Sequence, residues 1–277
     1  MPLSRLRSFV RRVLFWVWER SLGAALRQQQ LGRIAKELAI IVPDLRDQYS
    51  DLLIEGSYLT AKVRAVHAFQ IWLVQSALPE FMHPTIVDIG DSSGTHLRYL
   101  TGLASGPTAM RSLSVNMDAK AVERIRAKGL EAVHARAEEL TQYNIAADIF
   151  LCFETLEHLP NPIAFLHDLA TKTPAKYFIM TVPYVGNSRL GLHHIRNGRT
   201  APVSAENTHL FELCPADWRL LVQHTGWRIV RERIYRQYPR WHPLWFTKFL
   251  WQRLDFEGFY GMVLAKDDIW ANRYADW

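Results

Sequence analysis

The sequence has few of the features that mark disulfide-rich, zinc-binding or membrane-spanning proteins. Cys152 and Cys214 are the only cysteines among 277 residues, too few for a disulfide framework or for a zinc site built from cysteines. The longest apolar run of the N-terminal region, 13–18, is far shorter than the ~20 residues that a membrane-spanning helix needs. Glu19 and Arg20 follow that run, so it also lacks the cleavage site of a signal peptide. These absences indicate a protein of the reducing cytoplasm.

Positive charge is concentrated at one end of the chain. The net charge is +6, but residues 1–36 hold eight basic residues and one acidic residue, which leaves 25 basic and 26 acidic residues elsewhere. The main body is therefore close to neutral, and it contains no evident RNA-binding module. Because 49% of the residues are hydrophobic and 12% aromatic, that body is expected to fold around a sizeable core rather than to be disordered.

The N-terminal residues have the pattern of a basic amphipathic helix. Apolar residues recur at steps of three and four, with arginines between them and with Trp16 and Trp18 nearby. The recurring positions are Leu3, Leu6, Val10, Val13, Leu14 and Val17. One interpretation is that residues 1–28 contact an anionic membrane surface peripherally, on the inner face of a membrane. The other is a helix that packs on its own domain and leaves its arginines in solvent.

From Pro84 onward, short β-branched runs alternate with helical patterns. Strands are predicted at 85–90, 113–117, 131–135, 148–153, 177–182, 228–235 and 258–264. Helices are predicted at 59–78, from 95 onward, and at 119–128, 162–171 and 215–225. The alternation is typical of βαβ units and predicts an α/β fold with a doubly wound, mainly parallel, seven-stranded sheet. This domain is expected to span 79–277, after a helical N-terminal extension at 1–78, with a lid-like insertion at 184–208 and an aromatic-rich segment at 236–257.

A turn of small residues ends the first predicted strand. The segment Val87-Asp88-Ile89-Gly90-Asp91-Ser92-Ser93-Gly94 lies there, directly before a predicted helix. In a doubly wound sheet, ligands bind beyond the carboxyl ends of the strands, where the strand order reverses. Glycines allow the backbone to approach a ligand, and the next helix offers its N–H groups. The segment lacks the glycine and lysine pattern of a P-loop, so a nucleoside triphosphate is not indicated.

Three further motifs follow in order along the chain. They are Ser114-Val-Asn-Met-Asp118, Ala135-Arg-Ala-Glu-Glu-Leu140 and Cys152-Phe-Glu-Thr-Leu-Glu-His-Leu-Pro-Asn-Pro162. Together with Asp88-x-Gly90-x-Ser92-x-Gly94, they resemble the class I S-adenosylmethionine-dependent methyltransferases, over about residues 80–270. The resemblance implies a Rossmann-like fold and S-adenosylmethionine as cofactor.

The resemblance also implies which residues hold that cofactor. The methionine part would be surrounded by Asp88, Gly90, Ser92 and Gly94, the ribose would meet Asn116, the adenine would meet Met117, Ala137 and Glu138, and Phe153 would lie against the cofactor. Three positions depart from the family pattern: Ser92 replaces a glycine, while Asn116 and Arg136 replace acidic residues. Because Asn116 binds a hydroxyl without charge assistance, a somewhat weaker cofactor affinity is expected.

Glu154-x-x-Glu157-His158 carries the candidate catalytic groups. Methyl transfer to an oxygen needs a positioned acceptor and removal of its proton, roles suited to Glu157 and His158. Two carboxylates and an imidazole also suit a divalent metal ion that acidifies a bound hydroxyl. The motif resembles that of the small-RNA 2′-O-methyltransferases and the ubiquinone-pathway O-methyltransferases, which implies a metal site of Glu154, Glu157, His158 and His209. Related methyltransferases carry the same Glu-His pair without a metal, and in that alternative the pair orients the loop and His158 handles the proton.

The sequence therefore predicts a methyltransferase that acts on an oxygen of a small-molecule, carbohydrate or lipid-linked acceptor. The lid-like insertion is either a solvated loop or a cover that favours an anionic acceptor, since it contains Arg189, His193, His194, Arg196 and Arg199. The aromatic-rich segment either packs in the core or forms a wall for the acceptor. An RNA 2′-O-methyltransferase is the second enzyme candidate, although the near-neutral body argues against a nucleic-acid partner. A cofactor-binding scaffold without turnover is the alternative from another class.

Overall fold

The computed structural model describes residues 3–50, 52–104, 110–190 and 208–274. Its centre is a seven-stranded sheet with the strand order β3-β2-β1-β4-β5-β9-β8. The strands are β1 (Thr85–Ile89), β2 (Arg111–Asn116), β3 (Ala132–His134), β4 (Ile149–Phe153), β5 (Tyr177–Pro183), β8 (Trp227–Arg236) and β9 (Gly258–Lys266). The first five pair in parallel, whereas β9 runs antiparallel to both β5 and β8. The predicted α/β class and mainly parallel sheet are confirmed.

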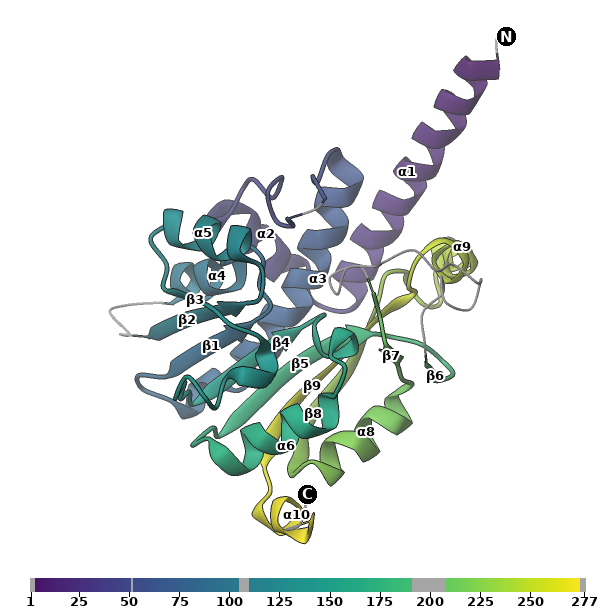
Figure 1. Cartoon of the computed structure of the whole chain (residues 1–277). Helices are drawn as coiled ribbons and strands as arrows, with labels where there is room; N and C mark the ends of the chain where they lie inside the picture. Colours follow the sequence, from purple (N-terminus) through teal and green to yellow (C-terminus); the bar gives the residue numbers. More distant parts are fainter. Residues whose placement is uncertain (1–2, 51, 105–109, 191–207, 275–277) are drawn as a thin grey trace, which may run out of the picture.

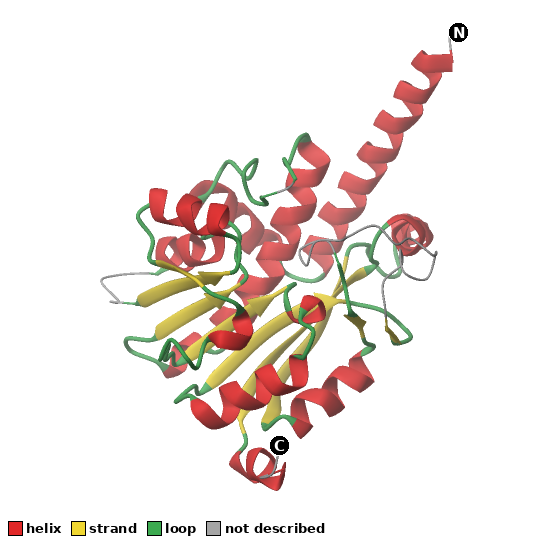
Figure 2. Ribbon diagram, in the orientation of Figure 1, coloured by secondary structure: helices red, strands yellow, loops and turns green. Residues whose placement is uncertain are grey.

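Helices cover both faces of this sheet (Figure 2). They are α1 (Leu3–Gln28), α2 (Gly32–Ile41), α3 (Ser57–Gln75), α4 (Thr95–Leu103), α5 (Ala119–Ala127), α6 (Pro162–Lys172), α8 (Pro215–His224), α9 (Thr247–Leu254) and α10 (Asp268–Ala271). Short 3₁₀ turns join them at η1 (Leu78–Glu80), η2 (Ala137–Glu139), η3 (Leu156–His158), η4 (Pro243–Phe246) and η5 (Asn272–Tyr274). Helices α1 to α4 share one hydrophobic core with the sheet, and α6 and α8 share the other.

The sequence of β4 shows why this sheet is buried on both faces. Ile149, Leu151 and Phe153 belong to the core beneath α1 to α4, while Phe150 and Cys152 belong to the core beneath α6 and α8. Successive side chains of a strand point to opposite faces, so a strand that is covered twice becomes a continuous apolar run. Cys152 is accordingly a core residue, as predicted.

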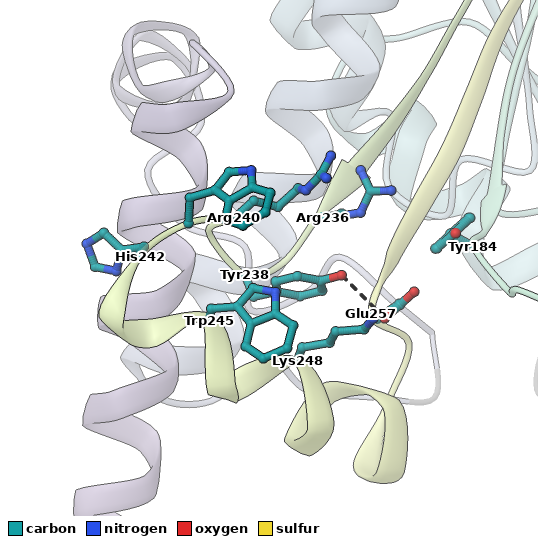
Figure 3. A pocket seen from close by; sticks show the side chains of 9 residues that line it. Tyr184, Arg236, Tyr238, Arg240, His242, Trp245, Lys248 and Glu257 are labelled. Atoms are coloured by element: carbon teal, nitrogen blue, oxygen red, sulfur yellow. Dashed lines mark hydrogen bonds between the residues drawn. The ribbon is translucent and has the colours of Figure 1, made fainter.

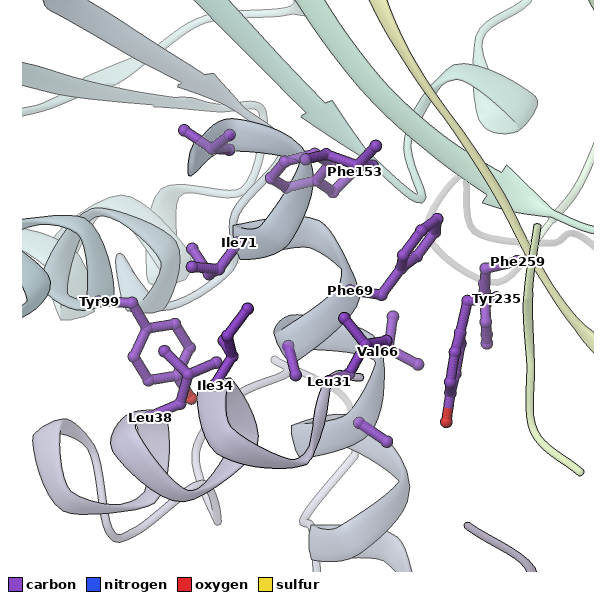
Figure 4. Close-up of a cluster of buried hydrophobic side chains, with 14 of the residues drawn as sticks. Leu31, Ile34, Leu38, Val66, Phe69, Ile71, Tyr99, Phe153, Tyr235 and Phe259 are labelled. Carbon is purple, nitrogen blue, oxygen red and sulfur yellow. The ribbon is translucent and has the colours of Figure 1, made fainter. Parts of the chain in front are cut away.

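The N-terminal helices are part of the same core rather than an appendage to it. Trp18 and Leu22 of α1 are buried in the cluster that also contains Phe69 of α3 and Tyr235 of β8, part of which is drawn in Figure 4. The rings of Trp18 and Trp251 lie 5.7 Å apart. The start of α1 projects away from the body (Figure 1), and Trp16 is 56% exposed. The second half of this helix thus packs on its own domain, as one of the two interpretations expected.

None of the helices in the described part of the chain is both long and apolar enough to cross a bilayer. The predicted lid-like insertion lies largely outside the described residues. Four of its predicted charged or titratable side chains lie there as well: His193, His194, Arg196 and Arg199. Residues 184–188 are irregular, as expected, but β6 (Arg189–Leu190) pairs antiparallel with β7 (Phe211–Glu212). Partners this far apart in sequence leave no local pattern, so the sequence did not reveal the pair.

Candidate active site

The strand order reverses between β1 and β4, at the carboxyl edge of the sheet. Strand β1 lies between β2 and β4, and Ile89 pairs with Val115 on one side and with Cys152 on the other. The ends of these three strands therefore lie next to one another. The residues that follow them gather at the edge of the sheet where doubly wound folds bind their ligands. The predicted cofactor residues Gly90, Asn116 and Phe153 all come from these ends.

The loop after β1 contains two glycines whose backbone has positive φ angles. Gly90 has φ +94° and Gly94 has φ +68°, a left-handed region that other residues rarely adopt. A Cβ atom added at Gly90 would lie 2.2 Å from Thr155 Oγ1, so the loop packs directly against the turn that follows β4. Ser92 is half-buried, and its carbonyl oxygen accepts a hydrogen bond from Arg124 Nη1 at 3.2 Å.

Asp88 lies buried at the end of β1 and is paired with a histidine. His96 Nδ1 lies 3.0 Å from Asp88 Oδ2, and the backbone N–H of His96 donates to Asp91 Oδ2 at 3.1 Å. Burial raises the pKa of Asp88 to about 6, and His96 opposes that rise. Burial alone would lower the pKa of His96, but the two carboxylates outweigh it and the pKa is raised. Together with Asp91, the pair fixes the loop at 90–94, called the donor loop from here on, against the start of α4.

A buried polar chain extends from this pair to the catalytic motif. Gln70 Oε1 lies 3.0 Å from His96 Nε2, and Gln70 Nε2 donates to Thr181 Oγ1 at 3.1 Å. Thr181 in turn hydrogen-bonds the carboxylate of Glu154. Sequence reasoning missed Gln70 and Thr181, because each lies in an ordinary helix or strand pattern far from the motifs. A polar residue at an expected core position was the only signal.

The predicted ribose and adenine residues lie around the ends of β2 and β3. Asn116 is buried, and its side chain hydrogen-bonds two neighbouring backbone groups. Its Nδ2 donates to the Asp91 carbonyl at 3.3 Å, and its Oδ1 accepts from the Asp118 backbone N–H at 2.8 Å. Asp118 caps α5 by accepting from Lys120 N. Met117, which directly follows β2, is 49% exposed.

The predicted adenine-edge residues lie in the short turn after β3. Ala137 and Glu138 are half-buried in η2, whereas Arg136 is exposed. Glu138 Oε2 lies 3.7 Å from Arg136 Nε, and Glu138 Oε1 is buried without a hydrogen-bond partner among the described residues. A buried acceptor oxygen of this kind suits a donor group of a ligand. Phe153 meets His96 edge to face, with ring centroids 4.9 Å apart.

A second cluster lies beyond the ends of β4 and β5. Glu157, His158 and His209 each offer a ligand atom, and these atoms all lie within 4.8 Å of one another. The backbone N–H of Leu210 donates to the Glu157 carbonyl at 2.8 Å and so fixes His209 beside the motif. Glu154 stands outside this trio of described residues, with its backbone at φ +50° directly after β4. The structure thus brings together three of the four predicted metal ligands.

The tautomers of both histidines follow from their partners. His158 Nδ1 lies 3.0 Å from the Thr208 carbonyl oxygen, and His209 Nδ1 lies 3.2 Å from Glu212 Oε1. The Thr208 carbonyl oxygen cannot donate, so His158 Nδ1 carries a hydrogen, and His209 Nδ1 carries one when Glu212 is ionised. Arg189 and His209 hold the pKa of Glu212 low despite its burial. A carboxylate or carbonyl behind a histidine is the usual support of a metal ligand.

The two glutamates differ from surface carboxylates in their ionisation. Burial raises the pKa of Glu154 to about 8, with Thr181 and Lys62 opposing the rise. Burial also raises the pKa of Glu157 well above its usual range, and the charge of Glu154 adds to the effect. Both carboxylate oxygens of Glu157 are buried without a hydrogen-bond partner among the described residues. A buried carboxyl with no partner needs a cation or a proton to be stable.

The family follows from a comparison of the sequence with known protein families. A model described as a methyltransferase domain matches residues 60–232, more than half of the chain. The chain belongs to this methyltransferase family. With the strand order and the donor loop described above, the prediction of a class I S-adenosylmethionine-dependent methyltransferase is confirmed. Among curated proteins, none matches the sequence of this methyltransferase.

Solved structures show the same fold at low sequence identity. The methyltransferase resembles the 1,6-didemethyltoxoflavin-N1-methyltransferase of Burkholderia thailandensis, solved with S-adenosylhomocysteine, at 14% identity and a TM-score of 0.51, covering 74% of this chain and 79% of that one. It resembles the magnesium protoporphyrin IX methyltransferase of Synechocystis PCC 6803, also with S-adenosylhomocysteine, at 15% identity and a TM-score of 0.51, covering 84% and 93%. It also resembles the 4+2 cyclase SpnF, at 11% identity and a TM-score of 0.54, over 88% of this chain and 96% of the cyclase. A cyclase on this fold shows that acceptor chemistry must be argued from the site.

Proposed function

We propose that this methyltransferase methylates an oxygen of a small-molecule, carbohydrate or lipid-linked acceptor, with Glu157 and His158 as catalytic residues. The observation that carries the proposal is the buried carboxyl group of Glu157. It has no hydrogen-bond partner among the described residues and lies beside His158 and His209. This cluster follows β4, whose end also supplies Phe153 to the donor side. Proton-accepting groups next to a donor crevice suit an oxygen nucleophile, which must lose a proton during transfer. Two solved relatives of the same fold are named for small-molecule acceptors, which agrees with the proposed class.

The residues have distinct parts in the proposed reaction. The acceptor oxygen forms a bond to the methyl carbon as the carbon–sulfur bond breaks, and the proton of the acceptor hydroxyl leaves. His158 Nε2 is the ring nitrogen that would accept this proton, because Nδ1 donates to the Thr208 carbonyl. The Asp88–His96 pair keeps the donor loop in place from the other side. Positioning and proton removal together account for catalysis by this chain.

A divalent metal ion fits the same cluster. Glu157, His158 and His209 would hold it, since the Glu157 carboxyl has no hydrogen-bond partner among the described residues and both imidazoles are oriented through Nδ1. Such an ion lowers the pKa of a coordinated hydroxyl. Glu212 and the Thr208 carbonyl would then support the two histidine ligands from behind. Burial raises the pKa of Glu157 well above its usual range, and a bound cation would oppose that rise.

We also propose that the start of α1 contacts an anionic membrane surface peripherally. Val13, Leu14 and Trp16 are exposed there, and Arg12 and Arg20 are exposed beside them. Arg20 lies over the ring of Trp16 at 5.1 Å. Exposed tryptophan next to arginine is the combination that binds the headgroup region of anionic bilayers. A lipid-linked acceptor would be reached from such a position.

Labelled donor tests the proposed chemistry whichever acceptor the protein uses. The full chain is incubated with methyl-labelled S-adenosylmethionine and a native cell extract, and label is measured in the small-molecule, lipid and RNA fractions. Glu157→Gln is expected to lower transfer about 100-fold or more, because it removes the carboxylate charge while preserving shape. Glu131→Gln, on the exposed surface, is the matched control and is expected to transfer as wild type does.

Two further measurements separate the parts of the proposal. S-adenosylhomocysteine binding, measured by calorimetry, should be equal in wild type and Glu157→Gln. Manganese binding should be lost in Glu157→Gln and kept in Glu131→Gln, and chelation should stop transfer. Transfer that survives Glu157→Gln would contradict the catalytic assignment, and transfer that survives chelation would contradict the metal. Label confined to the RNA fraction would contradict the acceptor class.

A further inference from the structure

A cavity of about 550 Å³ lies beside the proposed catalytic cluster, at the carboxyl edge of the sheet. Most of its walls come from the segment between β8 and β9, which the sequence marks only as aromatic-rich. Figure 3 shows the side chains that line it. The cavity is lined by Tyr184, Arg236, Tyr238, Arg240, Trp241, His242, Trp245, Lys248 and Glu257. Its size falls within the range of small-molecule sites.

The charges around the cavity are unbalanced. Arg236, Arg240 and Lys248 face it, and Glu257 is its one carboxylate. Within the described part of the chain, none of the three cations forms an ion pair with an acidic side chain, and Glu257 instead accepts hydrogen bonds from neutral donors, one of them Gln252 Nε2 at 2.7 Å. Three positive groups around one space repel one another, and an anion placed between them relieves that repulsion. Arginines hold phosphate oxygens in a bidentate manner.

The aromatic walls are placed for contact with a ligand rather than for packing. Trp241 is 92% exposed and Trp245 is also exposed, although large aromatic side chains are usually covered. Tyr184 lies beneath Arg236, whose guanidinium is 5.6 Å from its ring. Tyr238, by contrast, is buried and supports the floor. Exposed ring faces next to cations suit a ligand with an anionic group and a flat or apolar part.

The cavity adjoins the catalytic cluster through two short connections. The ring of Phe256 stacks on His209 with centroids 5.4 Å apart, and the next residue, Glu257, lines the cavity. Tyr184 directly follows β5, and its N–H donates to the Gly258 carbonyl at 2.9 Å. Phe256 and Glu257 thus connect the catalytic cluster to the wall of the cavity.

We propose that this cationic cavity binds a phosphate or diphosphate group of the acceptor, and thereby selects phosphorylated acceptors. The proposal rests on the proposed function for its link to methylation, because the cavity would hold the acceptor while Glu157, His158 and His209 act on its hydroxyl. The binding itself is a property of Arg236, Arg240 and Lys248. The source of the phosphate is either a soluble ester or the headgroup of a lipid.

Pyrophosphate is the probe for the cavity. Calorimetry is performed on the full chain, saturated with S-adenosylhomocysteine so that the donor site is filled, at fixed ionic strength. Wild type is expected to bind pyrophosphate, and the double variant Arg240→Glu with Lys248→Glu is expected to bind it roughly tenfold more weakly or worse. Both residues are at least partly exposed, so the fold should tolerate the change.

A second double variant controls for the altered net charge. Arg111→Glu with Arg228→Glu makes the same change at the amino ends of β2 and β8, away from the cavity, and should bind pyrophosphate as wild type does. Equal pyrophosphate affinity in the two double variants, or no binding by wild type, would overturn the proposal. S-adenosylhomocysteine affinity should be equal in all three proteins. Loss of label transfer in Glu157→Gln is measured separately, so failure of the cavity is distinguishable from failure of the catalytic assignment.

Vesicles identify the source of the phosphate. Phosphatidylcholine vesicles with and without phosphatidic acid are sedimented with each protein, and pyrophosphate is added as competitor. Competition by pyrophosphate in wild type, together with loss of phosphatidate-dependent binding in the cavity variant, would support the cavity and assign a lipid headgroup. Calorimetric pyrophosphate binding without such competition would support the cavity and assign a soluble phosphate ester.

Discussion

Gly90 meets two constraints at once in the donor loop. Its φ of +94° excludes most side chains, and a Cβ atom there would collide with Thr155. Gly129 has a similar φ of +78° but open space around its Cβ position. The two glycines therefore separate the effect of backbone strain from that of the close contact.

We predict that Gly90→Ala lowers the free energy of unfolding by several kcal/mol and weakens S-adenosylhomocysteine binding at least about tenfold, because the loop must move away from Thr155. Gly129→Ala should lower the free energy of unfolding by about 1–2 kcal/mol through strain alone and leave binding unchanged. Urea titration and calorimetry measure the two effects. Equal destabilisation by both substitutions would show that the contact with Thr155 is unimportant.

Residues of the site differ in how well the sequence reveals them. Asp88, Gly90 and Asn116 belong to compact motifs at strand ends, so their spacing alone brings them together on any doubly wound sheet. Gln70 is different, because its partners Thr181 and His96 lie 111 and 26 residues away. Only the packing of α3 on the sheet creates those contacts, and no local pattern encodes that packing.

Helix α1 combines a buried half and an exposed half. Deleting 1–28 to test membrane contact would also remove buried Leu22 and Ala25 and would damage the core. Substitutions at the exposed positions are therefore the better test. Trp16 and Arg20 are both exposed and lie against each other.

We predict that Trp16→Glu with Arg20→Glu lowers co-sedimentation with phosphatidylglycerol vesicles about tenfold, because an aromatic anchor and a positive charge are both replaced by negative charge. Ile40→Glu with Lys36→Glu makes the same chemical change on α2, where Ile40 is 80% exposed, and should have little effect. Donor binding should be unaltered in both. If the two variants lose vesicle binding equally, α1 has no specific part in it.

At the level of elements, alternation of apolar runs and helical patterns located all seven strands of the main sheet to within one or two residues. Strand β4, for instance, was expected at 148–153 and spans Ile149–Phe153. The β6–β7 pair was not anticipated, since each strand has only two residues and its register depends on a distant partner. The aromatic-rich segment proved to be mixed: Trp251 is core, whereas Trp241 and Trp245 line the cavity.

The stability of the whole molecule should depend on the pH through a buried histidine of α3. Burial lowers the pKa of His67 well below its usual value, and the nearby His96 and Arg64 lower it further. The other close group is Tyr99, whose hydroxyl lies 3.3 Å from His67 Nδ1. His67 therefore stays neutral in the folded protein, while the unfolded chain takes up a proton near pH 6.5. Acid thus favours the unfolded state through this residue.

We predict that His67→Gln changes the pH dependence of unfolding rather than abolishing folding. Relative to wild type, the variant should gain up to about 1.4 kcal/mol of stability for each pH unit below 6.5, and the difference should be constant above pH 7.5. Urea titrations between pH 5 and 8 measure it, and the difference between the two proteins cancels the opposing contributions of Asp88 and Glu154. His83→Gln, on the exposed surface, is the control. A pH-independent difference would refute the neutral, buried state of His67.

The residues around the crevice come from two separate stretches of the chain. Those assigned to the donor lie between 88 and 153, whereas the cavity walls come from Tyr184 and from 236–257. Under the proposed assignments, point changes in the later stretch would alter acceptor recognition and leave the residues assigned to the donor unchanged. Such a division lets a lineage, or a laboratory library confined to the last third of the gene, explore new specificities one substitution at a time.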